Sequence, residues 1–176
     1  MIAVVGYLVF ARPTFRGAVI NPSVPAPDFS IADTHGSLFR MNDMRGKVVL
    51  LYFGYTHCPD ECPLTMAHMK QALEFLGSRA QNVRVVMIST DPVRDTPRAL
   101  DDFLSHFSPA FLGITGSVDD LAKIYADYHV IVLEGGETHS SYTYVIDPKG
   151  KLRLTFLPDT TPADIANDLT ILLTQN

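Results

Sequence analysis

The chain has 176 residues, of which 47% are hydrophobic and 19% are charged, and its formal net charge is −5. This length and hydrophobic content predict one globular domain with a sizeable core. The negative net charge argues against a nucleic-acid-binding protein, because such proteins present a basic surface to phosphates. Two cysteines are too few for a disulfide scaffold, but they suit a single redox or metal centre.

The first eleven residues, MIAVVGYLVFA, are apolar and are followed by Arg12. A helix that spans a bilayer needs about 20 apolar residues, so this segment is too short to span one by itself. We interpret residues 1–11 as the remainder of a membrane anchor or as part of a signal segment, with a buried first strand as the alternative. Residues 12–24 contain proline and have little periodicity, which predicts a linker before a domain over 25–176.

An N-terminal β-hairpin is predicted over residues 28–40. Phe29 and Ile31 alternate with polar neighbours, and the apolar pattern resumes at Leu38 after a Thr-His-Gly turn. His35 lies in that turn, where we expect its side chain to be solvated.

The stretch from residue 48 to residue 66 carries the strongest structural signals of the chain. Its first part, Val48 to Phe53, is an unbroken apolar run rich in β-branched and aromatic residues, which predicts a strand buried on both faces. Gly54 ends this run, and Asp60 is the expected N-cap of a helix. Apolar residues then recur at intervals of three and four, at Met66, Met69, Leu73 and Leu76.

The only two cysteines, Cys58 and Cys62, lie between this strand and this helix. Unpaired N–H groups at a helix start favour thiolate over thiol, so we expect both thiols to have a lowered pKa. A spacing of four residues places the two side chains on the same side of a helical turn. Two such thiols can close a disulfide or hold a soft metal ion such as Cu(I), whereas the alternative is a pair of small core residues.

Other polar side chains near the cysteines admit structural interpretations. His57 either tunes Cys58 as a neighbouring cation or is an exposed or capping residue. His68 lies ten residues past Cys58, near the opposite face of the helix, and is predicted to be structural. Core roles are expected for Met66 and Met69, and loop or cap roles for Asp91 and Asp95.

The rest of the chain alternates strand and helix patterns. The expected elements are a strand over 82–89, a helix over 97–107 capped by Thr96, a helix over 118–125 capped by Ser117, strands over 128–133, 141–146 and 152–156, and a closing helix through Ile165, Leu169 and Leu172. This order predicts an α/β domain. It matches a thioredoxin-like fold, with a central mixed sheet flanked by helices and an extra N-terminal β-hairpin.

With these motifs in place, the chain resembles the Sco/SenC/PrrC family of copper metallochaperones over about residues 25–173. The motifs that carry the resemblance are PAPDF (25–29), GKV (46–48), YFGYTHCPDECP (52–63), STDPVRDTP (89–97), FLGITG (111–116) and the His-Ser pair at 139–140. The resemblance implies a thioredoxin-like fold that binds copper through Cys58, Cys62 and His139. It also implies delivery of that copper to the binuclear copper centre of cytochrome c oxidase, whose copper-acceptor subunit would be the partner.

Members of this family are usually tethered by an N-terminal transmembrane helix and face outside the cytoplasm. The apolar segment at residues 1–11 agrees with such a tether. We therefore expect an extracytoplasmic protein, in the periplasm or at the outer face of the cell membrane, anchored through its N-terminal segment.

The implied ligands suit copper. Thiolates are soft and favour Cu(I), and an added imidazole gives a mixed site that also holds Cu(II). A site with three protein ligands is open and can release its ion, whereas a closed site with four ligands retains it. A catalytic zinc site with two cysteines, one histidine and a water is the alternative.

One position departs from the family pattern. An aspartate usually precedes the ligand histidine, and here Thr138 precedes His139, with Glu137 one position earlier. The change leaves the implied ligands intact. It removes a negative charge that would steady a cation or orient the imidazole, and Glu137 is the residue that would substitute for it.

The sequence also admits two enzymatic functions. In the first, Cys58 and Cys62 are the redox-active pair of a thiol–disulfide oxidoreductase that reduces the cysteines of the copper acceptor, and a further thiol–disulfide reductant restores the pair. In the second, the chain is a peroxiredoxin-like peroxidase. The peroxidase ranks last, because it requires a proline before the reactive cysteine, whereas here the proline follows Cys58.

Overall fold

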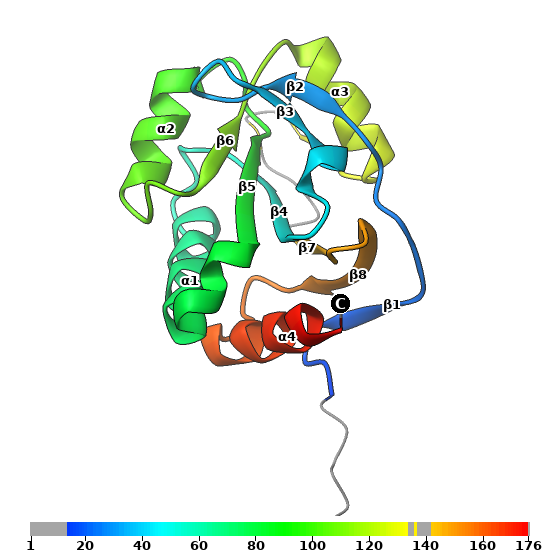
Figure 1. The fold of residues 1–176 in the computed structure, drawn as a ribbon. Coiled ribbons are helices and arrows are strands. Elements are labelled where there is room, and N and C mark those ends of the chain that lie inside the picture. The colour runs from blue at the N-terminus through cyan, green and yellow to red at the C-terminus, as the bar shows by residue number, and fades with distance from the viewer. Residues whose placement is uncertain (1–13, 134–135, 137–141, 176) are drawn as a thin grey trace, which may run out of the picture.

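The computed structural model describes residues 14–133, 136 and 142–175. The predicted anchor or signal segment at 1–11 and the predicted ligand His139 lie outside these residues. The described part of the chain forms a six-stranded sheet in the order β1-β8-β7-β4-β5-β6 (Figure 1). Its strands are β1 (Ala18–Pro25), β4 (Val48–Gly54), β5 (Val83–Ser89), β6 (Leu112–Ile114), β7 (Thr143–Ile146) and β8 (Lys151–Phe156).

The sheet is mixed, because β4, β5 and β6 are parallel while β7, β8 and β1 are antiparallel to their neighbours. A separate two-stranded hairpin joins β2 (Ser30–Ala32) to β3 (Leu38–Arg40), as predicted. The helices are α1 (Glu61–Leu76), α2 (Pro97–Ser105), α3 (Val118–Asp127) and α4 (Pro162–Thr174), with short 3-10 helices η1 (Met41–Met44) and η2 (Gly77–Asn82).

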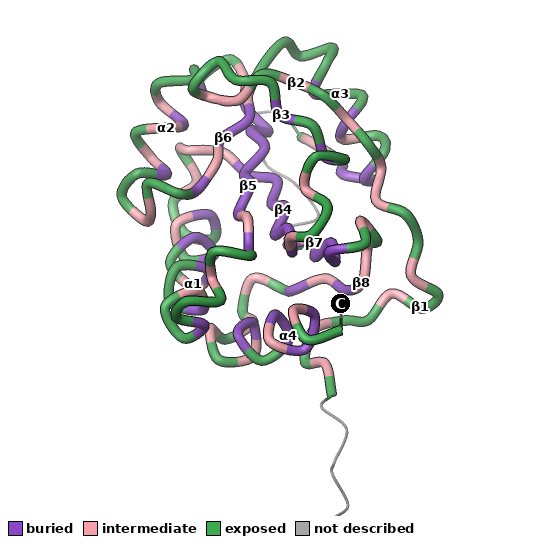
Figure 2. The backbone as a smooth tube through the Cα atoms, in the orientation of Figure 1, coloured by how far each residue is buried: buried purple, intermediate pink, exposed green. Residues whose placement is uncertain are grey.

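The central strand β4 divides the core into two layers. All seven of its residues are buried, which confirms the predicted strand, and Figure 2 shows β4 and β5 as the buried centre of the molecule. Alternate side chains of a strand point to opposite faces of its sheet. Val48, Leu50 and Tyr52 accordingly pack with α1, α2 and α4, whereas Val49, Leu51 and Phe53 pack with α3 and the β2–β3 hairpin.

Side-chain caps fix the starts of three helices. The Thr96 hydroxyl accepts a hydrogen bond from Ala99 N at 3.2 Å, and Pro97 occupies the first helical position of α2. Ser117 caps α3 in the same way, with 3.1 Å to Asp120 N, and Thr161 caps α4. The predicted caps Thr96 and Ser117 are therefore confirmed.

β1 occupies most of the segment predicted as a linker, 12–24. It pairs antiparallel with β8, with a register shift between Val19 and Val24. The buried carboxylate of Asp168 in α4 accepts hydrogen bonds from Arg16 N and Gly17 N at 2.8–3.0 Å. The chain before the hairpin is thus part of the domain, and its pairing partner lies about 130 residues away in the sequence.

Two further predictions need correction. Residues 128–133, predicted as a strand, form no named strand, although residue 132 takes part in an isolated bridge. The short strand β6 was not predicted as an element, and the helix predicted over 97–107 ends at Ser105.

Among the described residues, no helix combines the length and the apolar character that crossing a bilayer requires.

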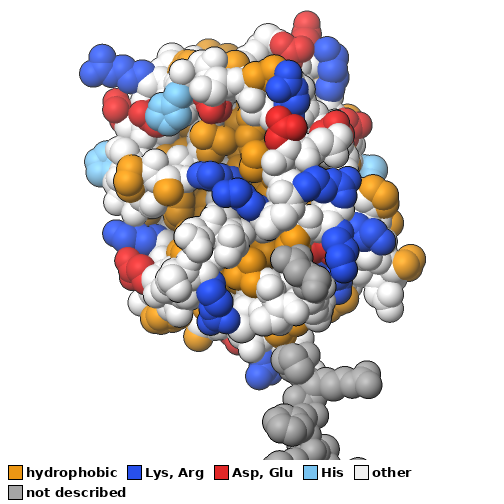
Figure 3. Space-filling model, in the orientation of Figure 1, with side chains coloured by type: hydrophobic (Ala, Val, Ile, Leu, Met, Phe, Trp, Pro, Cys, Tyr) orange, Lys and Arg blue, Asp and Glu red, His pale blue; other side chains and the backbone are white. Residues whose placement is uncertain are grey.

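The face drawn in Figure 3 carries basic and acidic side chains scattered around a central area of hydrophobic ones. This face lies over the β2–β3 hairpin and the central strands in the same orientation as Figure 1. Charges of both signs are therefore interspersed there.

Candidate functional site

Both cysteines lie where β4 passes into α1. Cys58 is in the turn after the strand and is partly exposed, whereas Cys62 is in the first turn of α1 and is only 3% exposed. The backbone N–H of Cys62 donates to Cys58 Sγ at 3.4 Å. Asp60 occupies the N-cap position as predicted, but its side chain makes no capping hydrogen bond. The Cys58 sulfur therefore accepts one of the free N–H groups at the helix start.

The Cys62 thiol lies between the helix and the sheet. Tyr52 donates its hydroxyl to Cys62 Sγ at 3.4 Å. Burial raises the pKa of Cys62 to about 12, although the Tyr52 hydrogen bond acts in the opposite direction. The predicted lowering of the thiol pKa is thus wrong for Cys62. Burial destabilises the thiolate by removing its hydration, and this effect exceeds the stabilisation that the N–H groups at the helix start provide. Burial likewise raises the pKa of Tyr52, so its hydroxyl remains a donor.

Gly54 provides the space for the buried sulfur. A Cβ atom at this position would lie 2.8 Å from Cys62 Sγ and 2.6 Å from Cε1 of Tyr52. Both separations are well below van der Waals contact. The end of β4 therefore requires glycine for the Cys62 thiol and the Tyr52 ring to approach the backbone this closely.

The turn that carries Cys58 is held by a buried aspartate. Asp95 is 0% exposed, and its two carboxylate oxygens accept from Thr56 N at 3.2 Å. The same carboxylate accepts from Thr56 Oγ1 at 2.6 Å and from Ser89 Oγ at 2.7 Å. The sequence predicts only a loop or cap role for Asp95, because no local pattern around this residue indicates that its carboxylate is buried beside the cysteine turn.

His57 lies on the solvent side of this turn, with 54% of its side chain exposed. Its Nδ1 is 3.0 Å from Thr56 Oγ1 and 3.9 Å from Asp95 Oδ1. The Thr56 hydroxyl proton is committed to Asp95, which only accepts. The Thr56 oxygen therefore accepts from His57 Nδ1–H, and the histidine is an exposed residue bonded to its own turn.

Gly136 packs against the cysteine turn. Thr90 Oγ1 donates to Gly136 O at 2.6 Å, and Gly136 has φ of +87°. A Cβ atom at Gly136 would lie 2.7 Å from Asp91 Cβ and 3.3 Å from Tyr55 Cγ. Two features therefore require glycine at position 136: the positive φ of its backbone and the close packing against Asp91 and Tyr55. This contact places residue 136 against the turn, three residues before the predicted ligand His139.

The described residues bring together two of the three predicted metal ligands, Cys58 and Cys62, and both are free thiols. His139, with Glu137 and Thr138, lies outside those residues, so the predicted role of His139 stays a prediction. Within the described part of the chain, no three His, Cys, Asp or Glu side chains group so as to hold a metal ion.

The remaining candidates have structural surroundings. Nδ1 of His68 is 3.1 Å from Thr160 O, which agrees with its predicted structural role. Met66 and Met69 are 0% and 1% exposed within the core, so the core prediction holds for both thioethers. The side chain of His35 is 54% exposed and lies 3.5 Å from Asp101.

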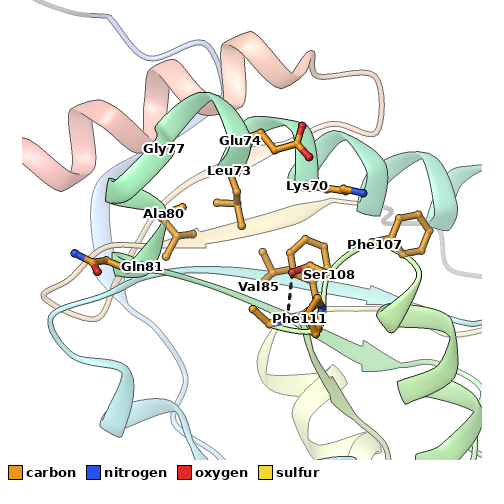
Figure 4. A pocket seen from close by; sticks show the side chains of 13 residues that line it. Lys70, Leu73, Glu74, Gly77, Ala80, Gln81, Val85, Phe107, Ser108 and Phe111 are labelled. Carbon is orange, nitrogen blue, oxygen red and sulfur yellow. Dashed lines mark hydrogen bonds between the residues drawn. The ribbon is translucent and has the colours of Figure 1, made fainter.

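A hollow of about 470 Å³ lies at the other end of α1 (Figure 4). Leu73, Val85 and Phe111 point into it, while Lys70 and Glu74 lie at its edge. α1 rises about 1.5 Å per residue, so this hollow is well separated from the helix start that carries the cysteines. It is therefore no part of the thiol site.

The fold and the site together define a class of protein. A mixed sheet covered by helices on both faces, with a partly exposed and a buried thiol where a central strand meets its helix, is a thioredoxin-like arrangement with paired cysteines. The SCO1/SenC family model matches residues 19–174 of the chain. The chain therefore belongs to the SCO1/SenC family, as the resemblance implied.

Three similar proteins illustrate the relationship. A SCO2-like protein from Rickettsia felis is 35% identical over 147 residues, which cover 78% of this chain and 72% of that protein. The solution structure of apo Sco1 from Thermus thermophilus has a TM-score of 0.81 at 34% identity, covering 93% of this chain and 99% of that one. The structure of ScoI from Bradyrhizobium japonicum, solved with copper bound, has a TM-score of 0.74 at 32% identity. The match covers 85% of this chain and 100% of that one.

Proposed function

We propose that the chain is a copper metallochaperone. It binds Cu(I) or Cu(II) through Cys58, Cys62 and His139 and delivers the ion to the binuclear copper centre of cytochrome c oxidase. The observation that carries the proposal is the meeting of two free thiols at one turn, where Cys62 N lies 3.4 Å from Cys58 Sγ. The copper held by the related Bradyrhizobium japonicum protein supports it.

The two thiols fit copper as a cargo that must enter and leave. Thiolate sulfur is the ligand type that Cu(I) prefers. Cys58 is partly exposed and is the sulfur that an incoming ion meets, whereas the buried Cys62 completes the clamp. Because the pKa of Cys62 is raised to about 12, copper binding displaces the proton of this thiol at neutral pH.

The proposed location and partners follow from the same function. We place the domain outside the cytoplasm, tethered to the membrane by the apolar segment 1–11. The copper-acceptor subunit of the oxidase is its partner. A thiol–disulfide reductant is the second, because copper binds the reduced thiols and an extracytoplasmic environment favours the disulfide.

A thiol–disulfide oxidoreductase is the second candidate, and the unequal exposure of the two cysteines favours it. An accessible Cys58 would attack a disulfide of the copper acceptor, and the buried Cys62 would then resolve the mixed disulfide. The acceptor would gain two electrons and two protons and leave as a dithiol, while Cys58 and Cys62 would be oxidised to a disulfide.

The test is an anaerobic copper titration of the reduced domain, beginning at Thr14 so that β1 is retained. We expect one copper per chain for the wild type and a clear loss of affinity for His139→Ala. His68→Ala is the matched control, because His68 contacts a backbone carbonyl and should leave copper binding unchanged.

Two results would contradict the proposal, either in its function or in its third ligand. If the wild type bound no copper tightly while Cys58 and Cys62 cycled freely against a thiol–disulfide couple, the oxidoreductase would replace the metallochaperone. If His139→Ala bound copper as the wild type does, the third ligand would have to be sought elsewhere.

A further inference from the structure

We propose that Asp95 is a positioning residue for the copper site, which holds Cys58 in place through Thr56. This inference deepens the proposed function, and its copper readout rests on that function. The juxtaposition that carries it is a fully buried carboxylate bonded to the backbone and side chain of the residue two positions before Cys58.

The turn itself explains why Thr56 controls Cys58. The Cys58 N–H donates to Tyr55 O at 3.4 Å, which closes a four-residue turn with Thr56 and His57 at its centre. Asp95 binds the first central residue of this turn by both its N–H and its hydroxyl. Moving Thr56 therefore moves the turn whose last residue supplies the exposed sulfur.

The carboxylate also ties the turn to the neighbouring strand. Its Oδ2 accepts from Ser89 Oγ at 2.7 Å, at the end of β5, while Oδ1 accepts from Thr56 Oγ1 at 2.6 Å. These contacts supply only donors to the carboxylate, so both of its oxygens must accept. Hydrogen bonds to an ionised acceptor are stronger than neutral ones, and Asp95 thus fixes the turn that follows β4 against the end of β5.

Asparagine cannot replace this carboxylate. Its amide offers one acceptor oxygen, and its NH₂ group, in the place of either carboxylate oxygen, would lie beside the Thr56 N–H, which can only donate. Asp95→Asn therefore keeps the size of the side chain while weakening its hydrogen bonds to Thr56. The Cys58 sulfur would then lose its fixed place beside the Cys62 N–H.

A second buried aspartate provides a matched control. Asp168 is also 0% exposed and also accepts from backbone N–H groups, those of Arg16 and Gly17, but it ties the start of β1 to α4. Asp168→Asn should cost stability through the same chemistry without touching the cysteine turn. The comparison separates positioning of Cys58 from support of the fold.

The experiment measures three quantities on the reduced domain: the midpoint of thermal unfolding, the Cu(I) affinity by competition with a chromophoric chelator, and the equilibrium of the Cys58–Cys62 disulfide with glutathione. Both Asp→Asn variants should unfold at a lower temperature than the wild type. Only Asp95→Asn should lose Cu(I) affinity, by about 10- to 100-fold, the usual effect of removing a partner that orients a metal ligand. Only it should also show a several-fold smaller equilibrium constant for disulfide formation, because the two sulfurs are no longer held together.

A second pair of variants keeps the inference testable if Asp95→Asn fails to fold. Thr56→Val removes the hydroxyl that Asp95 binds, and Thr56→Ser retains it. Thr56→Val should show the same copper and redox changes, and Thr56→Ser should restore wild-type values. Copper affinity and disulfide equilibrium that stay at wild-type values in Asp95→Asn, or in Thr56→Val, would overturn the role of Asp95.

The redox readout also separates this inference from the proposed function. If the wild type bound no Cu(I), the metallochaperone would fail, while the glutathione equilibrium would still report whether Asp95 holds the two sulfurs together. A wild type that binds Cu(I) beside an Asp95→Asn variant with unchanged values would leave the function standing and reject the positioning role.

Discussion

Cys58 and Cys62 are four residues apart in the chain, yet they lie in different surroundings. Cys58 is partly exposed at the end of a turn, and its sulfur accepts an N–H from the helix start. Cys62 faces the sheet, and its sulfur accepts a hydrogen bond from the hydroxyl of Tyr52. A helix start favours a thiolate and burial opposes one, and for Cys62 burial prevails. The pair therefore combines an accessible sulfur with a protected one.

This difference in burial predicts how the Cys62 thiol titrates and which cysteine reacts first with an alkylating agent. Because the folded state raises the pKa of Cys62 to about 12, the folded thiol holds its proton more tightly than the unfolded one, whose pKa is about 8.5. This shift adds to the free energy of unfolding. The contribution is complete at pH values below the pKa of the Cys62 thiol in the unfolded chain, and it is lost as the pH rises toward 12. At pH 7, we expect iodoacetamide to modify Cys58 well before Cys62. Peptide mapping of the alkylated protein at a series of pH values measures both rates.

A matched variant isolates this effect. Cys62→Ser retains a small polar side chain but has no thiol, so its unfolding free energy should fall less between pH 8 and pH 11 than that of the wild type. Equal alkylation rates of the two wild-type cysteines at pH 7 would contradict the burial of Cys62.

The junction of β4 and α1 depends on close packing at Gly54. Gly54→Ala would place a methyl group 2.8 Å from Cys62 Sγ and 2.6 Å from the Tyr52 ring. We expect a loss of about 1–3 kcal/mol in the free energy of unfolding, as for other overpacked cores. Because the sulfur must move, the variant should also bind Cu(I) more weakly. Urea unfolding and chelator competition measure the two effects.

Gly113→Ala is the control for this variant. Its Cβ would lie 2.7 Å from Thr34 Cγ2 and 2.8 Å from Leu100 Cγ, so it overpacks the structure around β6, away from the thiols. It should lose stability and keep its Cu(I) affinity. Similar copper losses in both variants would mean that Gly54 affects the site only through general destabilisation.

The elements that the sequence predicted correctly are those with local signals. Examples are the apolar run of β4, the three- and four-residue spacing in α1, and the Thr96 cap before Pro97. Each of these signals is formed by residues that are only a few positions apart in the chain. The position of the cysteine pair between strand and helix followed from these local signals. Its chemistry was predicted only in part, because the raised pKa of Cys62 depends on the sheet packed against it.

The features that escaped prediction depend on partners far away in the chain. β1 contains two prolines and becomes a strand only by pairing with β8. β6 has three residues and is defined by its neighbour β5. Asp95 resembles an ordinary loop residue until the fold brings Thr56 and Ser89 to its carboxylate. Local propensity carries no information about such contacts.

For the whole molecule, the site and the N-terminal part of the domain lie on different strands of the sheet. The cysteine turn follows the central strand β4, whereas β1 is an edge strand separated from β4 by β8 and β7. Asp168 and the partly buried Phe15 attach the chain before β1 to the layer that contains α4. Changes at this edge should therefore alter stability far more than copper binding.

The start of the folded domain tests this separation. A chain that begins at Thr14 retains β1 and both N–H donors to Asp168, so we expect it to be as stable as the full sequence. A chain that begins at Ala26 exposes the edge of β8 and leaves a buried carboxylate without two of its donors. The lost donors alone should cost about 1–3 kcal/mol of unfolding free energy.

Urea unfolding measures the stability of the two chains, and size-exclusion chromatography detects pairing between exposed β8 edges. The shorter chain should unfold at lower urea and tend to associate, while its folded fraction should bind Cu(I) as the longer chain does, because β4, α1 and Asp95 are intact. Equal urea midpoints would show that β1 adds nothing to the domain and that residues 12–24 act as the linker their sequence predicts. A loss of Cu(I) affinity in the folded shorter chain would instead show that the edge of the sheet supports the cysteine turn.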